Sequence, residues 1–517
     1  MASVAHPDPG NRSWNRVIDR GIAVALITLS VLFAMEWLLS LQWRMVHDSP
    51  LNHYVAFLWQ RFGMFPYRDV FEVQMPGTFL FHRTIGTLLG YGDMAFRVTD
   101  LAWLTAIQWL TWKVLRRFGR EAAWAGVILF GLSYLHGPSM SLQKDYLGVL
   151  PVMAAVLLAA SGTRRPELRG LGIGALFGVA ACFKPHLSLG LPVVLFFLMR
   201  QGALPRIRVL RLLALGAAGW ALPVAGAGAW VWWNGALPEF RDILGSYLPL
   251  YLELTVNHQT ASGWPRVGYL FWQFKELGGQ GLWLLPAGFA LHRVVRDDGM
   301  NPETRRLAYL LGALTVVYAV YPLPAGQFFQ YHWMPFQFFV IALACLSLQP
   351  HSGKVPDRLF PVAALALAAF VSLHLPADLP RQLLGQGPKP PQDGRADEIA
   401  QFLRAHLKPG DTVQPLDWTG GSVHGMLLAE AQLATRFLYD YQFHHHVSHP
   451  EIQALRRRFL AEFRNRPPRF VIDVESGRAW VFGEDTSVRF PELERILQEG
   501  YVAVFHGDGY RILARRE

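Results

Sequence analysis

The stretch Phe62–Gly77 places one basic and two acidic side chains among aromatic residues and two prolines. Arg68 and Asp69 are adjacent, and Glu72 follows three residues after Asp69. A carboxylate held here could act as a general base that removes a proton from an acceptor hydroxyl or amine during group transfer. The alternative is an ion pair between Arg68 and a carboxylate that only fixes the shape of the loop. The aromatic and proline neighbours favour the catalytic interpretation.

The composition of the chain indicates where this stretch must lie. The chain has 517 residues, of which 52% are hydrophobic and 17% charged, with 18 Trp and 34 Phe. Globular proteins carry roughly 25% charged residues, so this composition predicts a polytopic membrane protein. The net charge of +10 does not indicate nucleic-acid binding, because most basic residues form short clusters between apolar segments. The two cysteines are far apart in sequence and indicate neither a disulfide framework nor a thiolate metal site.

Apolar segments dominate residues 1–375 and predict a mainly α-helical domain with about 11 transmembrane helices. They cover residues 21–41, 94–115, 122–137, 146–161, 170–183, 186–199, 212–233, 281–294, 307–323, 333–348 and 359–375. Lys and Arg are frequent in alternate short loops, which predicts a cytoplasmic N-terminus and an extracytoplasmic C-terminal part. The glycines of Gly170–Gly178 lie inside an apolar segment and predict close helix packing.

Two segments on the predicted outer side are long. Residues 42–93 contain the stretch Phe62–Gly77, flanked by the amphipathic pieces Leu51–Phe62 and Gly77–Leu89. Residues 234–280 contain Pro238–Leu254, in which apolar and charged residues alternate. We expect these amphipathic pieces to be helices that lie along the membrane interface rather than cross it.

The composition changes after residue 375. Residues 376–394 are rich in proline and predict a linker, and residues 395–517 predict a soluble extracytoplasmic α/β domain. Its expected elements are helices at Ala396–Leu407 and Phe490–Glu499, a strand at Phe470–Val474, and paired strands at Tyr501–Phe505 and Tyr510–Leu513. The histidines between His444 and His449 predict a surface turn before a helix at Pro450, because adjacent histidines cannot all face one metal ion.

Other charged residues lie near the predicted outer face. Lys144 and Asp145 occupy a short turn between apolar segments, where charges are either functional or paired with each other. Lys184 follows a short apolar segment and would either bind a phosphate as a point charge or extend its amine from a helix end toward water. Arg97, at the start of the second span, would clamp a phosphate oxygen or mark the interface. His332 lies among aromatic residues of the kind that form interfacial belts.

The run from Pro66 to Gly77 resembles the first outer loop of GT-C-type integral-membrane glycosyltransferases. It is most similar to the protein O-mannosyltransferases and the lipid A aminoarabinose transferase, which share a P-x-R-D…P-P-G pattern and a following Arg. Arg97 fits that Arg, Lys184 fits a later Lys-Pro pair, and Asp145 fits an acidic turn before the fourth span. The resemblance covers roughly the first 200 residues by motif and the other spans by topology. The departures are Met75-Pro76 for a Pro-Pro pair, and Lys144 where a small residue is usual.

The resemblance implies a transferase on the outer, periplasmic face of the cell inner membrane. Its donor would be a sugar on a polyprenyl phosphate and its acceptor a glycan, lipid or protein, with inversion at the anomeric carbon. It implies that Asp69 is the base and that Glu72 assists it or orients the acceptor, directly or through a divalent metal such as Mg²⁺, Mn²⁺ or Ca²⁺ bound by both. The implied catalytic residues are Asp69, Glu72 and Asp145, the phosphate-binding residues Arg97, Lys184, Lys144 and His332, and the substrate-loop residues Tyr67, Arg68 and Gln74.

Two other functions remain open on the sequence. A transporter or flippase of lipid-linked sugars usually shows repeated halves with a site in the middle of the membrane. In this sequence the charges gather at one interface and no repeat is evident, which favours the transferase. A sugar-polymer ligase of similar architecture is not distinguished from a transferase by any residue pattern.

Overall fold

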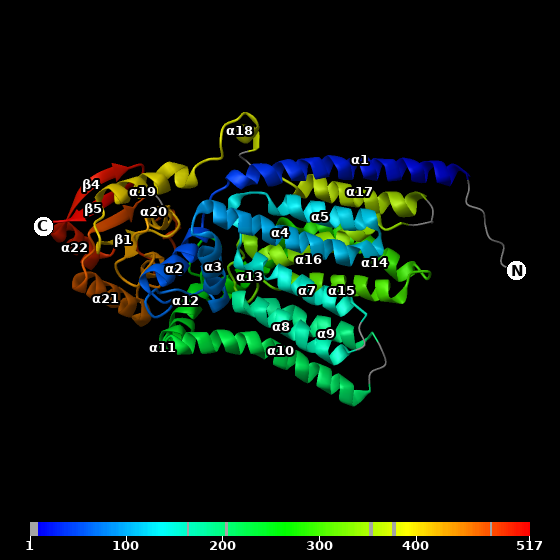
Figure 1. The fold of residues 1–517 in the computed structure, drawn as a ribbon, viewed down its shortest axis with the longest axis horizontal. Coiled ribbons are helices and arrows are strands. Elements are labelled where there is room, and N and C mark those ends of the chain that lie inside the picture. Colours follow the sequence, from blue (N-terminus) through cyan, green and yellow to red (C-terminus); the bar gives the residue numbers. More distant parts are fainter. Residues whose placement is uncertain are drawn as a thin grey trace.

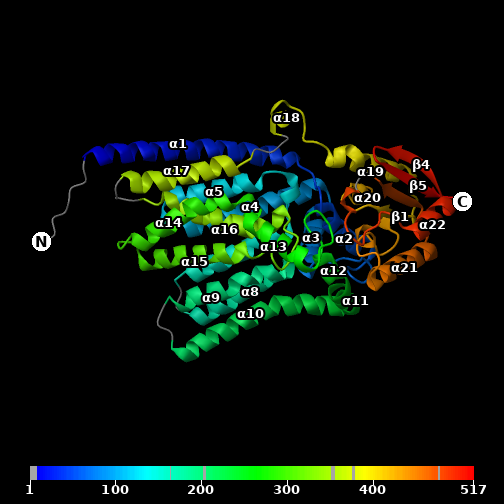
Figure 2. The same cartoon turned by 180° about the vertical axis from the view of Figure 1, so that it is seen from behind.

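The apolar segments predicted to cross the membrane are helical in the computed structural model. The structure describes residues 9–162, 165–201, 205–350, 355–374, 379–475 and 478–516. Helices that match the predicted segments are α1 (Pro9–Leu39), α4 (Asp93–Leu115), α5 (Arg120–Tyr134), α7 (Val149–Ala160), α8 (Pro166–Phe183), α9 (Leu191–Met199), α10 (Arg206–Trp233), α14 (Leu284–Arg296), α15 (Pro302–Ala319), α16 (Met334–Ala344) and α17 (Val355–Ser372). Figures 1 and 2 show them lying lengthwise in a bundle, with a small sheet domain at one end.

Helix length and composition alone identify fewer membrane-spanning helices than the 11 that the sequence predicts. Within the described ranges, five helices are long and apolar enough to cross a bilayer, which supports an integral membrane protein. The helices α7 and α9 have only 12 and 9 residues, too few to span the hydrocarbon by themselves. The count of about 11 spans therefore stays a prediction.

The glycines of Gly170–Gly178 lie on α8 where this helix packs closely against α10. A Cβ atom at Gly174 would lie 2.0 Å from the carbonyl oxygen of Gly216 on α10. A Cβ atom at Gly219 would lie 2.1 Å from the carbonyl oxygen of Leu171. Side chains at these positions would push the two backbones apart, so the predicted close packing is confirmed.

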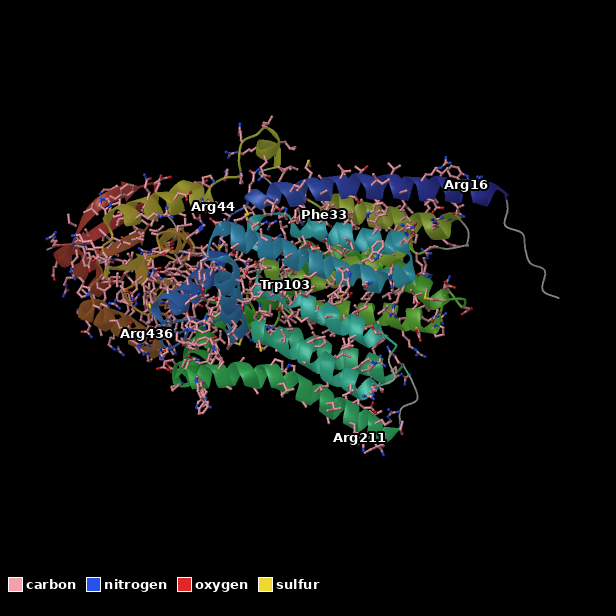
Figure 3. All side chains as sticks on the ribbon, viewed as in Figure 1. Arg16, Phe33, Arg44, Trp103, Arg211 and Arg436 are labelled. Atoms are coloured by element: carbon pink, nitrogen blue, oxygen red, sulfur yellow. The ribbon has the colours of Figure 1, made fainter. Side chains whose placement is uncertain are left out.

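The arginines labelled in Figure 3 lie toward both ends of the molecule. Arg16 on α1 and Arg211 on α10 lie at the end of the bundle away from the sheet, whereas Arg44 and Arg436 lie toward the C-terminal domain (Figure 3). These positions do not test the predicted topology, which stays a prediction. Arg164 and Lys354 of the predicted cytoplasmic loops lie outside the described residues.

The long outer segments form short helices at the mouth of the bundle. They are α2 (Ser49–Phe62), α3 (Pro76–Leu89), α11 (Leu237–Asp242), α12 (Leu248–Leu252) and α13 (Gly263–Glu276), with α6 (Lys144–Leu147) nearby. Helix α2 ends at Gly63, whose left-handed backbone caps it and turns the chain into the loop that carries Asp69 and Glu72. A π-helical turn, Ile243–Tyr247, joins α11 to α12 within the predicted helical piece Pro238–Leu254. The amphipathic pieces are helical as predicted, and the part of α2 from Ser49 to Leu58 is buried under neighbouring elements.

The C-terminal domain is a five-stranded sheet with helices packed against it. The strand order is β2-β1-β3-β5-β4, with β1 parallel to β2 and β3, and β5 antiparallel to β3 and β4. The strands are β1 (Thr412–Leu416), β2 (Gln432–Leu433), β3 (Phe470–Val474), β4 (Tyr501–Gly507) and β5 (Tyr510–Arg515), and the helices are α19 (Arg395–His406), α20 (Ser422–Leu428), α21 (Pro450–Asn465) and α22 (Pro491–Gly500). The predicted helices, the strand Phe470–Val474 and the terminal strand pair are confirmed, whereas β1, β2 and α20 lacked a clear pattern.

The histidine tract differs in part from its prediction. Helix α21 begins at Pro450 as predicted. His444 and His445 are buried, however, so the predicted surface turn is wrong for these two residues. They pack against the ring of Trp480, which the sequence places far from them.

The link between the bundle and the C-terminal domain is only partly described. Residues 375–378, at the start of the predicted linker, lie outside the described residues. The described part contains a short helix α18 (Leu379–Leu383) and a turn at Pro391–Gly394. The domain boundaries at residues 375 and 394 therefore stay a prediction.

Candidate active site

A cavity of about 180 Å³ lies where the outer loop, the mouth of the bundle and the C-terminal domain meet. The outer segments contribute Asp48, Glu72 and Gln74 to its wall, and α12 with its π-helical turn contributes aromatic rings. Its polar and aromatic lining residues are Asp48, Asn52, Glu72, Gln74, Lys144, Phe183, Lys184, His186, Tyr247, Tyr251, Gln327, Tyr331, His332, Trp418, Tyr439 and Tyr441. The cavity thus brings together Glu72, Gln74, Lys144, Lys184 and His332, which the sequence analysis named separately.

Glu72 is the carboxylate that the outer loop turns toward this cavity. Its side chain is 2% exposed, and its Oε2 accepts a hydrogen bond of 3.2 Å from the backbone N–H of Val73. Burial raises the pKa of Glu72 to about 7, although the nearby Lys144 amine and the Val73 N–H oppose the rise. A carboxyl group with a pKa near neutral pH is suited to accept a proton as a general base.

Asp48 is a second buried carboxylate in the cavity, and it differs from Glu72 in its partners. Its Oδ1 lies 3.1 Å from His47 Nδ1, and Tyr331 donates a hydrogen bond of 3.3 Å to its Oδ2. Burial opposes the charged form, but the His47 imidazole and the Lys144 amine hold the pKa of Asp48 well below its ordinary value. Asp48 therefore stays ionised and is a weaker proton acceptor than Glu72.

Two lysines bring positive charge to the same cavity. Lys184 Nζ lies 2.8 Å from Asp145 Oδ1, which also accepts a hydrogen bond of 2.7 Å from the Tyr321 hydroxyl. Asp145 therefore pairs with Lys184, which the sequence placed in another turn, and not with its neighbour Lys144. Lys144 is 6% exposed, lines the cavity and makes no ion pair with any residue that the structure describes. An ammonium group placed in this way is available to an anionic ligand.

Asp69 occupies a different environment from Glu72. Its Oδ2 accepts hydrogen bonds from Arg68 Nη2 at 2.7 Å, Arg68 Nε at 3.0 Å and the backbone N–H of Phe65 at 2.8 Å. The Asp69 side chain is 34% exposed, and it is not among the residues that line the cavity. This geometry is that of the loop-fixing ion pair, and the catalytic role of Asp69 stays a prediction.

The remaining predicted loop residues hold the loop in shape. Tyr67 has a left-handed backbone with φ of 71°, is buried, and donates a hydrogen bond of 2.7 Å to the carbonyl oxygen of Gln74. Arg68 Nη1 donates a hydrogen bond to the carbonyl oxygen of Asn234, after α10. Tyr67 thereby fixes the turn that exposes Asp69 and buries Glu72.

Arg97 lies in a buried network beside the cavity rather than in its wall. Its Nη1 is paired with Asp100 and donates a hydrogen bond of 3.0 Å to Ser141 Oγ. Its guanidinium group also lies over the ring of Trp43, at 4.8 Å from the ring centroid. In this arrangement Arg97 supports the segment before Lys144, and its predicted contact with phosphate stays a prediction.

The C-terminal domain supplies three aromatic side chains that sequence reasoning missed. The Phe71 N–H donates a hydrogen bond of 2.8 Å to the carbonyl oxygen of Arg436, and this contact joins the domain to the outer loop. Trp418, Tyr439 and Tyr441 thereby enter the cavity wall. No local pattern marks these residues, because their role depends on a contact between segments far apart in sequence. Asp48 carried a weak signal, since it follows a histidine and stands directly before α2, whose second residue is Pro50.

A metal site was the remaining expectation for Asp69 and Glu72. Among the described residues, no group of three or more His, Cys, Asp or Glu side chains is arranged to hold a metal ion. Glu72 lines the cavity and Asp69 does not. The binding of Mg²⁺, Mn²⁺ or Ca²⁺ by this pair, which the resemblance allowed, stays a prediction.

Comparison with known proteins gives a match in structure. No protein-family model matches the chain, and no curated protein matches it. The crystal structure of ArnT from Cupriavidus metallidurans bound to undecaprenyl phosphate is similar, with a TM-score of 0.59 and 12% identity over 94% of this chain and 97% of that chain. Arabinofuranosyltransferase AftD from Mycobacteria gives a TM-score of 0.48 and 14% identity over 95% of this chain and 40% of that chain, a likeness too weak to argue from. The match to ArnT shows that this chain shares the fold of that protein, which agrees with the fold expected from the outer-loop motif.

Proposed function

We propose that the chain is a glycosyltransferase that moves a sugar from a polyprenyl phosphate to an acceptor on the periplasmic face of the inner membrane. The observation that carries the proposal is the cavity itself, which places the buried carboxyl group of Glu72 beside the amines of Lys144 and Lys184. A sugar transfer from a phosphate needs one group to accept a proton and cations to stabilise the leaving anion.

The surroundings of the cavity favour a lipid-linked donor. Phe183 lines the cavity and also an apolar groove of about 380 Å³, whose wall includes Leu80 on α3, Val179 on α8 and Trp230 on α10. A substrate with a phosphate group and a long apolar chain would place the phosphate at Lys184 and the chain in this groove. The similar ArnT structure was determined with undecaprenyl phosphate bound, which supports this class of carrier.

The chemical step follows from these positions. The acceptor hydroxyl oxygen forms a bond to the anomeric carbon while the bond from that carbon to the phosphate oxygen breaks. Its proton passes to Glu72, and the bond electrons leave with the lipid phosphate, whose charge Lys144 and Lys184 stabilise. Attack from the face opposite the phosphate inverts the anomeric carbon. In this proposal Glu72 is the base, and Asp69 remains the competing candidate.

The test is sugar transfer by the full chain in liposomes, from a panel of polyprenyl-phosphate sugars, with Glu72→Gln as the variant. We expect transfer by the intact chain and its loss in the variant, which should still bind donor because both lysines are kept. Movement of labelled lipid between leaflets without transfer from any donor would contradict the proposal and favour a transporter.

A further inference from the structure

The C-terminal domain contains a second and larger cleft, of about 870 Å³, formed by α22 and the sheet. Four arginines and four acidic residues line it, together with apolar side chains such as Leu497 and Val502. The cleft and the cavity described above share no lining residue. The segment Tyr439–Tyr441 lies between them, because Tyr439 and Tyr441 line the first cavity and Asp440 lines the cleft.

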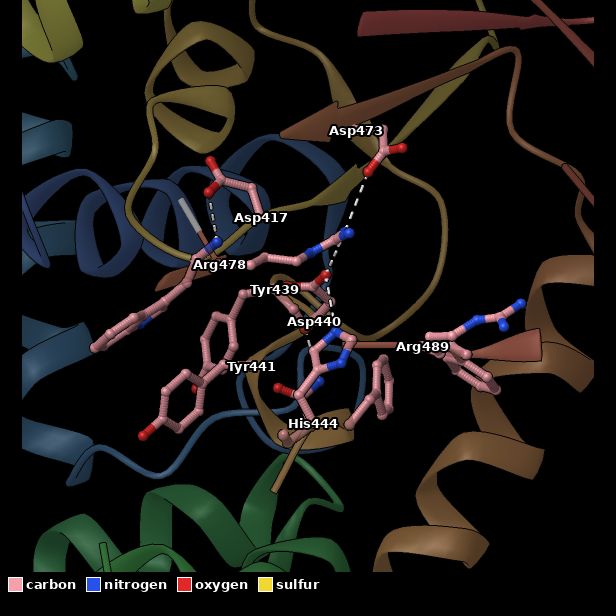
Figure 4. Close-up of polar contacts among 12 residues, drawn as sticks. Asp417, Tyr439, Asp440, Tyr441, His444, Asp473, Arg478 and Arg489 are labelled. Atoms are coloured by element: carbon pink, nitrogen blue, oxygen red, sulfur yellow. Dashed lines mark hydrogen bonds and ion pairs between the residues drawn. The ribbon is translucent and has the colours of Figure 1, made fainter. Parts of the chain in front are cut away.

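A charged network around the buried carboxylates of Asp440 and Asp473 forms the polar side of the cleft. Arg478 Nη2 donates hydrogen bonds of 2.9 Å to Asp440 Oδ2 and 3.1 Å to Asp473 Oδ1. Arg511 donates a hydrogen bond of 2.9 Å to Asp473 Oδ2. Figure 4 shows the Arg478 guanidinium group between the two carboxylates, with Tyr439 and Tyr441 pointing away from it. The pairing fixes the orientation of these groups before any ligand binds.

Two atoms of this network lack a partner. Asp440 is 3% exposed, and its Oδ1 has no hydrogen-bond partner among the described residues. The Nε of Arg478 is also buried and has none within the same part of the chain. Buried polar atoms of this kind cost free energy unless something satisfies them. A ligand that both donates to a carboxylate and accepts from a guanidinium group would complete the network.

The charge and shape of the cleft narrow the class of ligand. The balance of acidic and basic residues gives no preference for a strongly charged ligand, either anionic or cationic. Hydroxyl groups donate and accept hydrogen bonds at the same atom, as Asp440 and Arg478 require. The apolar wall formed by Leu497 and Val502 suits the C–H faces of a sugar ring. These properties together fit a neutral saccharide.

We propose that this cleft is a saccharide-binding site of the C-terminal domain, and that it holds the glycan part of the acceptor near the cavity. The proposal that the cleft binds a saccharide does not depend on the proposed transferase function. The proposal that this saccharide is the acceptor rests on that function. Because Asp440 and the two cavity tyrosines are consecutive, a glycan seated on Asp440 would lie next to the segment that forms the cavity wall.

The test is saccharide binding to the full chain in nanodiscs without donor, measured by saturation-transfer NMR with neutral di- to tetrasaccharides and the matching uronic-acid oligosaccharides. Val502 and Val504 provide a matched pair, since both lie on β4 with 48% and 47% exposure but only Val502 lines the cleft. We expect Val502→Trp to weaken binding of a neutral saccharide by about tenfold or more, and Val504→Trp to leave it unchanged. Gln498→Trp, at an exposed cleft position on α22, should act like Val502→Trp.

Three outcomes would overturn the proposal. They are absence of binding for every neutral saccharide, equal effects of Val502→Trp and Val504→Trp, and preferential binding of the uronic-acid compounds. Glu72→Gln should bind the saccharide normally, so a failure of sugar transfer and a failure of this binding site would be distinguished. In transfer assays Val502→Trp should raise KM for the glycan acceptor and leave kcat unchanged.

Discussion

Two charged clusters at the mouth of the bundle differ in their surroundings. The first is the ion pair of Arg68 with Asp69, which is partly exposed and in which Asp69 Oδ2 accepts hydrogen bonds from Arg68 and from the N–H of Phe65. The second consists of three charges that line the cavity, Glu72, Lys144 and Lys184, with Asp145 as the partner of Lys184, and we call these four the cavity charges. The Arg68–Asp69 pair fixes the shape of the loop, whereas Lys144, which has no ion-pair partner among the described residues, is available to a ligand.

The largest effect within the cavity charges is expected at Lys184. Replacement by Gln would leave the carboxylate of Asp145 buried without its cation, which costs about 3–5 kcal/mol of folding free energy. We expect both a lower melting temperature and loss of transfer in Lys184→Gln. Thermal unfolding in detergent, followed by transfer assays on the folded fraction, measures both. A variant with unchanged stability would show that the Lys184–Asp145 contact contributes little.

Lys144→Gln separates catalysis from stability within the same cluster. Lys144 has no ion-pair partner among the described residues, so its removal should change the melting temperature little. Transfer should fall by about 10²-fold, because a cation near the leaving phosphate is lost. The measurement is kcat/KM for the lipid donor beside the melting curve. Normal transfer by Lys144→Gln would remove this lysine from the proposed phosphate site.

The pH dependence of transfer should follow Glu72. Burial raises the pKa of Glu72 to about 7, so its basic form increases as the pH rises through that value. We expect the transfer rate to rise with pH through about 7 and to level off above it. Glu72 also ionises at lower pH in the unfolded chain than in the folded one, so unfolding free energy should fall between about pH 4.5 and 7. A transfer rate that stays constant between about pH 5.5 and 8 would contradict the assignment of Glu72 as the base.

The smallest effect is expected at the exposed ion pair. Asp69→Asn should lower the unfolding free energy by about 1 kcal/mol or less, because surface ion pairs contribute little. The matched control is Arg68→Gln, which removes the other side of the same pair and should have a similar effect. Chemical denaturation of both variants checks the prediction. A large and unequal loss would show that the pair does more than fix the loop.

Parts of this site could be predicted from sequence because their signals are local. The apolar segments, the outer loop and the strand Phe470–Val474 each carry a periodicity or a composition of their own. That Glu72 and not Asp69 lines the cavity could not be predicted, because it depends on the left-handed backbone of Tyr67 and on the bond from Phe71 to the C-terminal domain. The pairing of Asp145 with Lys184 could not be predicted either, because Lys184 lies at the end of another helix.

The aromatic residues of the cavity wall were even harder to predict from the sequence. Trp418 and Tyr441 come from the C-terminal domain, which carries no sequence signal that relates it to the outer loop. The contact of His258 Nδ1 with the Tyr441 hydroxyl, at 2.8 Å, joins that domain to the segment between α12 and α13. Contacts of this kind depend on the whole fold and not on spacing along the chain.

The most direct test of the account compares Glu72→Gln with Asp69→Asn in the same liposomes, at saturating lipid donor and with donor binding measured in parallel. We predict that Glu72→Gln lowers kcat by about 10²–10⁴-fold while Asp69→Asn changes it by a few-fold at most. Both variants should bind the donor, because neither change removes a lysine from the cavity. Loss of transfer in Asp69→Asn with normal transfer in Glu72→Gln would contradict the assignment and place the base at the exposed end of the loop.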